Sequence, residues 1–355
     1  MDLLALLKKE WLVVRRNLGL FILLLIIFPG LLIVGTGAYD RTIPEDIPVA
    51  IVPADDTTTE DDLNIIRGGV TFFASPIDYE NGESAREDLN REQVYLILEV
   101  PGGLTDEEAD VNFTIVSDQT FAPFQDPANI SADILDNYLG GALPADITVN
   151  HDRIGEHRGL TSFLVPTVLL AFIVLYGLIF VPYQFYKERQ VLNRLRTETR
   201  IETVVVSKIG FHTGLLLTPL IVTAFITDWL SYGVSVINPL TIVTTSVSFL
   251  FLVSFGLATL FLLNLRREAL FINAVLALGI LTTSSFIYPV GFFSPLRQMI
   301  ARAIPTHYSI ITLRSATLRD VPATLYQDYL AYLLLTWFAT SIILIAGIVL
   351  YRRVR

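Results

Sequence analysis

Apolar residues gather into long, uncharged runs whose length suits a membrane-spanning helix. Crossing ~30 Å of hydrocarbon takes about 20 mostly apolar residues. Such runs lie between Arg16 and Asp40, Arg158 and Lys187, Lys208 and Asp228, Glu268 and Arg297, and Asp328 and Arg352. A longer apolar stretch contains the turn signal Asn238-Pro239, which leaves Leu240–Leu265 as a further span. The pattern therefore predicts six spans.

The first apolar run, 18–39, is too long for a cleaved signal peptide and has no small-residue cleavage site behind it. We interpret it as a retained span. The second span is predicted at 159–186, and four more lie within 209–351. A mean hydropathy of +0.56 agrees with a membrane protein.

Between the first two spans, the segment 40–158 changes to a pattern of alternating strands and helices. Short apolar or alternating stretches predict strands at 47–52, 70–74, 94–100 and 111–116. Helices are predicted at 59–67, 84–91 and 128–139, the second with Ser84 and Glu87 as a capping box. The segment is long enough for a hydrophobic core of its own, and it predicts an inserted α/β domain.

Charge is divided sharply between this segment and the rest of the chain. Residues 40–158 carry 26 Asp and Glu against six Arg and no Lys, whereas the other residues carry nine acids and 19 Lys and Arg. Lys and Arg collect in connections on the cytoplasmic side of membrane proteins. Here they occur before the first span, in 187–208, at Arg266-Arg267 and in the tail 352–355. The distribution predicts cytoplasmic termini and an extracellular acidic domain.

Four arginines do not fit this orientation, because they fall on the predicted outer side: Arg297, Arg302, Arg314 and Arg319. Moving them inside would require an odd number of spans and would place the tail 352–355 outside. We therefore keep six spans.

The acidic composition favours a solvated surface suited to very salty surroundings, since at ~1 M salt the Debye length falls to about 3 Å. We interpret the chain as a plasma-membrane protein of a salt-loving archaeon. Cation capture by Asp55-Asp56 is the alternative, but calcium-loop spacing is absent. His151 and His157 are interpreted as parts of a hydrated linker rather than metal ligands. There is no Cys, and the sequons at Asn112 and Asn129 are possible glycosylation sites on the predicted outer side.

The sequence has no motif for catalysis or for nucleotide binding. A Gly-rich phosphate loop, an HExxH and a GxSxG are all missing, and span interiors lack paired acids. Ion-driven transporters usually need such ionisable groups. We expect no catalytic residue, no metal and no cofactor on this chain, so its energy has to come from a partner.

Two predicted cytoplasmic segments are amphipathic. In 1–17, Leu7, Trp11 and Val14 recur at helical spacing among basic residues, which predicts a helix lying at the interface. In 187–208, Leu192 and Leu195 form an apolar edge among alternating Arg and Glu. This second segment is too patterned for a simple tether between spans.

The segment 187–208 resembles the cytoplasmic segment of type-2 ABC exporter permeases. It keeps the Glu188-Arg189 pair, Leu192, Leu195, Thr197 and Lys208, and it lacks the family's Gly-Thr and Thr-Pro elements. A second stretch, Gly291 to Pro295 and then Pro305, Tyr308 and Leu313-Arg314, is similar to the family's segment after the fifth span. In the family that segment forms short outer helices, here predicted as a re-entrant segment at 292–328.

The resemblance implies the membrane subunit of an exporter that works by alternating access. ATP and Mg would be bound by a separate ABC ATPase subunit, and a second permease copy or homologue would pair with this chain in the bilayer. Nucleic acid is not an expected partner. The residues implied in coupling to the ATPase are Glu188, Arg189, Leu192, Leu195, Arg196 and Thr197. Those implied in the outer gate are Gly291, Pro295, Pro305 and Tyr308.

Other functions remain open on the sequence. Glu188-Arg189 can instead form juxtamembrane salt bridges, and the prolines can simply end helices. A membrane-anchored extracellular binding or scaffold protein is the main alternative function. Neither the transported substrate nor the choice between homodimer and heterodimer can be read from these residues.

Overall fold

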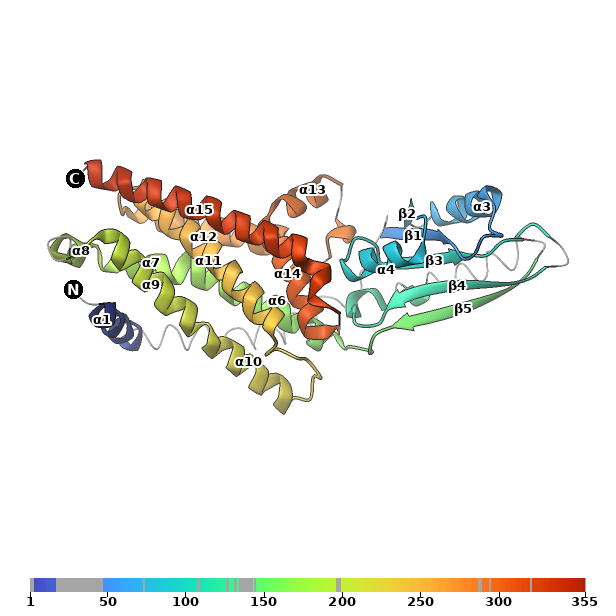
Figure 1. Cartoon of the computed structure of the whole chain (residues 1–355), viewed down its shortest axis with the longest axis horizontal. Helices are drawn as coiled ribbons and strands as arrows, with labels where there is room; N and C mark the ends of the chain where they lie inside the picture. Colours follow the sequence, from blue (N-terminus) through green and yellow to red (C-terminus); the bar gives the residue numbers. More distant parts are fainter. Residues whose placement is uncertain are drawn as a thin grey trace.

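The computed structural model shows an elongated molecule with a helical bundle at one end and a β-sheet domain at the other (Figure 1). Both chain termini lie at the end of the bundle remote from the sheet, here called the terminal end. The structure describes residues 3–16, 47–72, 74–106, 109–125, 128–130, 133, 143, 145–195, 199–286, 289–293, 295–319 and 321–354. The predicted first span, 18–39, lies outside these residues.

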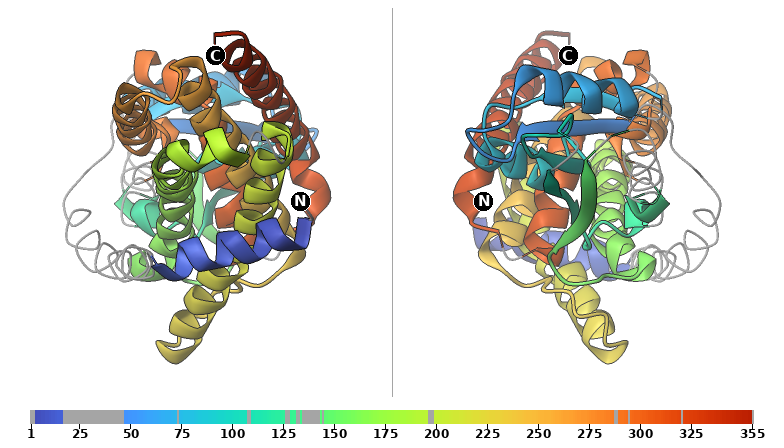
Figure 2. Two further views of the ribbon diagram at one scale, coloured as in Figure 1. Left: turned by 90° about the vertical axis from the view of Figure 1, so that its left-hand side faces the viewer. Right: turned by 90° about the vertical axis from the view of Figure 1, so that its right-hand side faces the viewer.

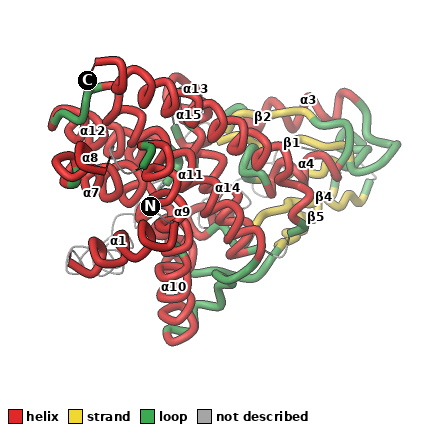
Figure 3. Tube along the Cα trace, turned by 60° about the vertical axis from the view of Figure 1, so that its left-hand side comes forward, coloured by secondary structure: helices red, strands yellow, loops and turns green. Residues whose placement is uncertain are grey.

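A mixed five-stranded sheet forms the core of the sheet domain. Its strands are β1 (Ile47–Pro53), β2 (Ala74–Asp78), β3 (Leu96–Val100), β4 (Asp110–Asp118) and β5 (Asp146–Ile154), in the order β2-β1-β3-β4-β5. Strand β1 runs parallel to β2 and β3, whereas β4 is antiparallel to β3 and parallel to β5. Helices α3 and α4 lie beside the strands, and most of the other helices lie away from the sheet (Figure 3).

Two helices cover opposite faces of this sheet. Because side chains alternate along a strand, Val49 and Ile51 of β1 share a core with α3 (Glu60–Val70). Ala50 and Val52 pack instead in a separate cluster with α4 (Gly82–Asn90). The predicted α/β insertion is thus present, with a hydrophobic layer on each side of its sheet.

Some details of the predicted sheet domain were wrong. Strand β2 starts at Ala74 instead of ending there. Helix α4 is capped by Asn81, whose side chain accepts from the Ser84 backbone N–H at 2.9 Å, so Ser84 is not the cap. The capping box belongs to α3, where Thr59 and Asp62 bond reciprocally. Most of the predicted helix 128–139 lies outside the described residues.

His151 was interpreted as part of a hydrated linker, but it lies in the edge strand β5, Asp146–Ile154. His151 lies on this strand, with its Nε2 at 2.9 Å from the Ser117 hydroxyl of β4. Burial and Arg153 lower the pKa of His151 below its ordinary value. This histidine is therefore part of the sheet.

Four helical stretches of the described chain are long and apolar enough to cross a membrane: 160–187, 201–229, 239–262 and 323–353. They comprise α6 (Leu160–Leu175), the π-helical η2 (Tyr176–Phe180) and α7 (Val181–Lys187); α9 (Ile201–Leu215) and α10 (Leu217–Trp229); α11 (Pro239–Leu262); and η4 (Ala323–Tyr326) with α15 (Gln327–Val354). Helix α12 (Arg267–Thr283), at 17 residues, covers part of the predicted span before Arg297. The predicted break at Asn238-Pro239 is confirmed, because Asn238 caps α11 by accepting from the Thr241 N–H at 2.8 Å.

The spans differ in how deeply they are buried. Most of the apolar windows of 160–187 and 239–262 are buried, whereas less than a third of those of 201–229 and 323–353 is buried. Helix α10 projects from the bundle (Figures 2 and 3) and exposes Ile221, Phe225 and Trp229. The 160–187 and 239–262 helices therefore form the centre of the bundle, and α10 lies at its edge.

Short helices close both ends of the bundle. At the sheet end, η3 (Val290–Phe292), α13 (Pro295–Ala303) and α14 (Pro305–Leu318) precede η4, and α14 packs against α6, α11 and α15. At the terminal end, α1 (Leu3–Arg16) lies across the bundle, and α8 (Arg189–Leu195) follows α7 (Figure 2). Leu6 and Val14 of α1 are buried while Trp11 and Leu12 are exposed, as expected for a helix with two different environments.

Candidate functional site: a charge cluster at one end and a buried junction at the other

Four charged side chains form a closed cluster at the terminal end. Lys208 of α9 donates to Glu10 Oε2 at 2.7 Å and to Glu188 Oε1 at 3.0 Å. Lys9 donates to Glu10 Oε1 at 3.1 Å and also to Glu188 Oε2. Each carboxylate therefore bonds to both ammonium groups. This charge cluster (Lys9, Glu10, Glu188 and Lys208) has no net charge.

The charge cluster is stable only as a complete set. The side chains of Lys208 and Glu10 are 0% and 1% exposed, so neither can exchange its partners for water. Burial lowers the pKa of Lys9, but Glu188 and Glu10 outweigh this effect and raise its pKa above the ordinary value. The pairing fixes α1 and α9 to the turn between α7 and α8.

Glu188 occupies that turn, between the last residue of α7 and the first residue of α8. Its backbone N–H donates to the carbonyl groups of Gln184 and Phe185, and its own carbonyl accepts from Val191 and Leu192. The same residue thus ends one helix and begins the next, while its side chain enters the charge cluster.

Among the residues of α8 whose side chains the structure describes, 189–192, the exposed ones are Arg189, Gln190 and Val191. The Arg189 guanidinium carbon lies 4.2 Å from the centre of the Tyr186 ring, which holds the side chain in place. Leu192 is 1% exposed and belongs to the core of the bundle. Leu195 ends α8. Arg196 and Thr197 lie outside the described residues.

At the opposite end, a turn of the sheet domain bonds to the bundle. The Asn90 carbonyl accepts from Arg319 Nη1 at 2.6 Å and from the Tyr326 hydroxyl at 2.9 Å. Arg91 donates through Nη2 to the Leu325 carbonyl at 3.0 Å, and the Gln93 amide to the Tyr329 hydroxyl at 3.3 Å. These contacts join residues more than 200 positions apart. We call the turn Asn90–Gln93 the docking turn.

Two buried ion pairs strengthen this junction. Glu92, in the left-handed region at φ 57°, accepts from Arg314 Nη1 at 2.9 Å, and both side chains are almost fully buried. Asp118 Oδ2 lies 2.7 Å from Arg319 Nη2. Burial lowers the pKa of Arg319, but Asp118 and Glu92 outweigh this and raise it above the ordinary value.

The ion pairs explain two of the four arginines that do not fit the charge rule. Arg314 and Arg319 are neutralised by acids of the sheet domain. Arg297 stacks on Phe293 at 3.8 Å and donates to the Thr282 carbonyl at 2.8 Å. Arg302, on α13, has a carbonyl that accepts from the Tyr308 hydroxyl at 3.0 Å. Local contacts, not loop orientation, account for where the side chains of Arg297, Arg314 and Arg319 lie.

The predicted gate residues do not form one group. Gly291 N–H donates to the Tyr95 hydroxyl at 3.2 Å, and a Cβ at Gly291 would lie 2.2 Å from the Tyr95 ring. Pro295 and Pro305 are the first residues of α13 and α14. Tyr308 packs against the rings of Tyr329 and Tyr332, with centroids 5.0 and 4.8 Å away. Gly291 therefore contacts the sheet domain, the two prolines begin helices, and Tyr308 belongs to a group of tyrosine rings.

The sequons lie on the surface of the sheet domain. Asn112, on β4, and Asn129 are both exposed. The Asn129 side-chain oxygen accepts from Arg153 Nη2 at 3.4 Å. Their exposure leaves the glycosylation prediction as it stood.

Sequence reasoning missed the residues that hold these sites together: Glu10, Glu92 and Asp118. It singled out Lys208 only as the end of a motif. One signal was available, because Arg314 and Arg319, which lie on the side opposite to most of the other basic residues, take acids as partners. The acid-rich segment was the only large source of such counter-charges.

The fold and these sites define a polytopic membrane protein that carries an α/β domain on one end of its helical bundle. A family model described as ABC-2 family transporter protein matches residues 18–351, and the chain belongs to that family. It is therefore a permease subunit of an ABC transporter, a family that normally works with an ABC ATPase subunit. Comparison with curated proteins and with solved structures gives no significant match.

Proposed function

We propose that this chain is the permease subunit of an ABC exporter in the plasma membrane, with six spans. The terminal end faces the cytoplasm and the acidic sheet domain faces outward. The separation of the two ends supports this orientation, because α8 and the C-terminal basic residues lie far from the sheet (Figure 1). Arg352 near the C-terminus pairs with Glu202 at 2.7 Å, so the tail belongs to the same end as α9.

The ATPase subunit docks on the exposed surface of α8 and supplies ATP and Mg. Arg189, Gln190 and Val191 provide a positive charge and an apolar contact there, while Leu192 anchors α8 in the bundle. The observation that carries this proposal is the bonding of Glu188 to Lys9 and Lys208. Glu188 therefore acts on α1 and α9 rather than on the ATPase surface.

Transport follows from coupled tilting of helices in an alternating-access cycle. Closure of the ATPase dimer pushes α8, and the charge cluster carries the displacement to α1 and α9 as one unit. A second permease copy or homologue completes the path, and the exposed apolar sides of α10 and α15 are available for that copy and for lipid. A scaffold role gives no reason for a buried charge cluster beneath an exposed α8.

Reversal of charge on α8 tests this function. The variant Arg189→Glu should reduce transport-linked ATP hydrolysis by about tenfold or more, since it places a carboxylate where the ATPase meets a cation. Arg267→Glu is the matched control, because Arg267 is also exposed but lies at the start of α12. Equal activity of the two variants in proteoliposomes with the ATPase subunit would contradict the role of α8.

A further inference from the structure

A cavity of about 660 Å³ opens beside the docking turn, between the sheet domain and the ends of three spans. Arg158 and Glu156 line it from the segment that joins β5 to α6, and Gly233 from the connection between α10 and α11. Pro239 and Leu240 of α11 and Leu318 of α14 add an apolar wall. Its volume falls within the range of sites for small organic ligands.

Arg158 is the group in this cavity that is suited to a ligand. Its Nε is buried and has no hydrogen-bond partner among the residues that the structure describes. Its Nη2 pairs at 2.7 Å with Glu156, whose side chain is 79% exposed. A carboxylate so accessible to water is easily displaced. The guanidinium can then bind a phosphate or carboxylate through two parallel hydrogen bonds.

Helix ends add positive potential to the same cavity. Helix α11 begins at Pro239 in the cavity wall, and α6 begins two residues after Arg158, with no side-chain cap at Gly159. The N-terminus of a helix favours anions. The opposing C-terminus of α14 is masked, because its Ala316 and Thr317 carbonyls accept from the Asn238 side chain at 2.8 Å and the Ser235 N–H at 3.1 Å.

The cavity also lies where three spans end, and its lining includes both apolar residues, such as Leu240 and Leu318, and charged residues, such as Glu156 and Arg158. This arrangement matches a molecule with an anionic head and an apolar tail. The remaining charged pair in its wall, Asp118 with Arg319, is already committed to the junction. Arg158 thus stays available for the head group.

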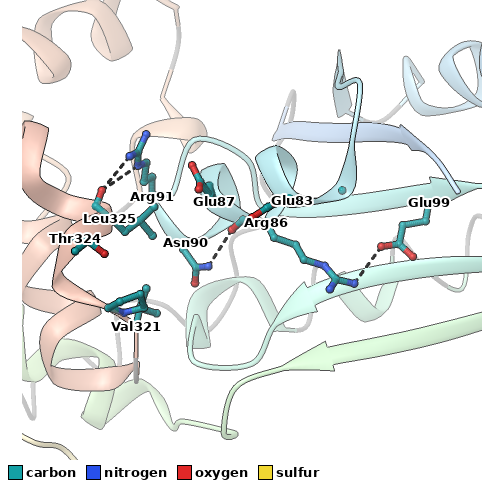
Figure 4. Close-up of a pocket in the computed structure, with 11 residues that line it drawn as sticks. Glu83, Arg86, Glu87, Asn90, Arg91, Glu99, Val321, Thr324 and Leu325 are labelled. Carbon is teal, nitrogen blue, oxygen red and sulfur yellow. Dashed lines mark hydrogen bonds and ion pairs between the residues drawn. The ribbon is translucent and has the colours of Figure 1, made fainter.

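The neighbouring cleft between α4 and η4 has a different character (Figure 4). Three carboxylates, Glu83, Glu87 and Glu99, line it. Its two arginines are already engaged, Arg86 with Glu99 and Arg91 with the Leu325 carbonyl. An anion would therefore prefer the cavity at Arg158.

We propose that the cavity at Arg158 binds an anionic amphiphile, with the head group at Arg158 and the tail along Leu240 and Leu318. The site is independent of the transport cycle proposed above, since it concerns binding to the resting permease. Two sources offer this chemistry, namely a two-chain lipid of the bilayer and a free single-chain amphiphile.

Native mass spectrometry of the full chain in detergent tests the proposal with two lipid probes, dioleoyl phosphatidylglycerol and dioleoyl phosphatidylcholine. Wild type should retain the anionic lipid in preference to the zwitterionic one. Arg158→Gln should weaken binding of phosphatidylglycerol at least fivefold and leave phosphatidylcholine unchanged. Arg158→Lys, which keeps the charge but not the paired donors, should fall between the two.

Arg297→Gln is the matched control, since Arg297 also lies near the sheet end but does not line the cavity. Wild-type affinity for phosphatidylglycerol in Arg158→Gln, or an equal loss in Arg297→Gln, would overturn the proposal. Dodecyl phosphate then separates the sources. If it displaces phosphatidylglycerol, the cavity accepts a single-chain amphiphile, and if it does not, the ligand is a two-chain membrane lipid. Failure of both anionic probes to bind wild type would also overturn the proposal.

Discussion

Lys208 shows how much one buried side chain contributes at the terminal end. Among the described residues, its ammonium group is the only part of α9 that pairs with the two carboxylates of the charge cluster. Removing one member of a buried ion pair leaves an uncompensated charge and costs ~3–5 kcal/mol. We therefore expect Lys208→Met to lower the stability of the permease strongly, as measured by thermal unfolding in detergent.

The exposed pair of Arg352 with Glu202 provides the comparison. Its side chains are 53% and 39% exposed, and such pairs contribute ~0–1 kcal/mol. Arg352→Gln should consequently leave the unfolding temperature almost unchanged. If Lys208→Met were as harmless as Arg352→Gln, the charge cluster would not stabilise the terminal end.

Only a glycine fits at position 291, because neighbouring side chains leave no room for a Cβ atom. A Cβ there would lie 2.2 Å from Cε2 of Tyr95 and 3.1 Å from Cδ of Pro48. Overpacking of this kind typically costs ~1–3 kcal/mol. Gly291→Ala should therefore lower the unfolding temperature and loosen the junction, while Gly68→Ala, with nothing within 4 Å of its Cβ, should not. Equal melting of the two variants would contradict the contact with Tyr95.

Residues of the sites were predictable only where they belong to a local motif. Glu188 and Arg189 stand out because they are adjacent and open an amphipathic helix. Glu10 and Glu92 do not, because Lys208 and Arg314, with which they pair, lie 198 and 222 positions away and meet them only when the helices and the sheet assemble. No local periodicity encodes such a distance.

At the scale of elements, the capping of α4 by Asn81 can be tested by substitution. Asn81 accepts from the Ser84 N–H, and removal of an N-cap side chain costs about 1 kcal/mol. Asn81→Ala should destabilise the sheet domain by that amount and increase hydrogen exchange in the first turn of α4. Ser84→Ala should have little effect, since only its backbone is used. A larger effect at Ser84 would restore the capping box predicted from the sequence.

Elements with strong patterns were predicted well, and those at the edges of the sheet were not. Four of the predicted apolar runs matched the four candidate spans of the described residues, because hydrocarbon demands continuous apolar length. Strand β5 was missed because an edge strand exposes polar residues, and His151, Asp152 and Arg153 obscure the alternation of Ile147 and Val149. Strand β2 is an edge strand as well, and it contains Pro76.

For the whole molecule, orientation is the property on which the proposed function depends. The chain has no cysteine, so a single one can be introduced at will. Glu83→Cys, exposed on α4, and Gln190→Cys, exposed on α8, lie at opposite ends. An impermeant maleimide applied to intact cells should label the first and not the second, and both should react after lysis. Labelling of Gln190→Cys in intact cells would reverse the orientation.

The docking turn has a mechanical consequence. Glu92, Arg91 and Gln93 bond the sheet domain to α14, η4 and α15 at once, so that domain is a rigid extension of those helices. A small rotation of α15 would therefore displace the far tip of the sheet much more than the helix itself, because displacement grows with distance from the axis of rotation. A fluorophore near α3 would then report, from outside the bilayer, a helix movement too small to follow within it.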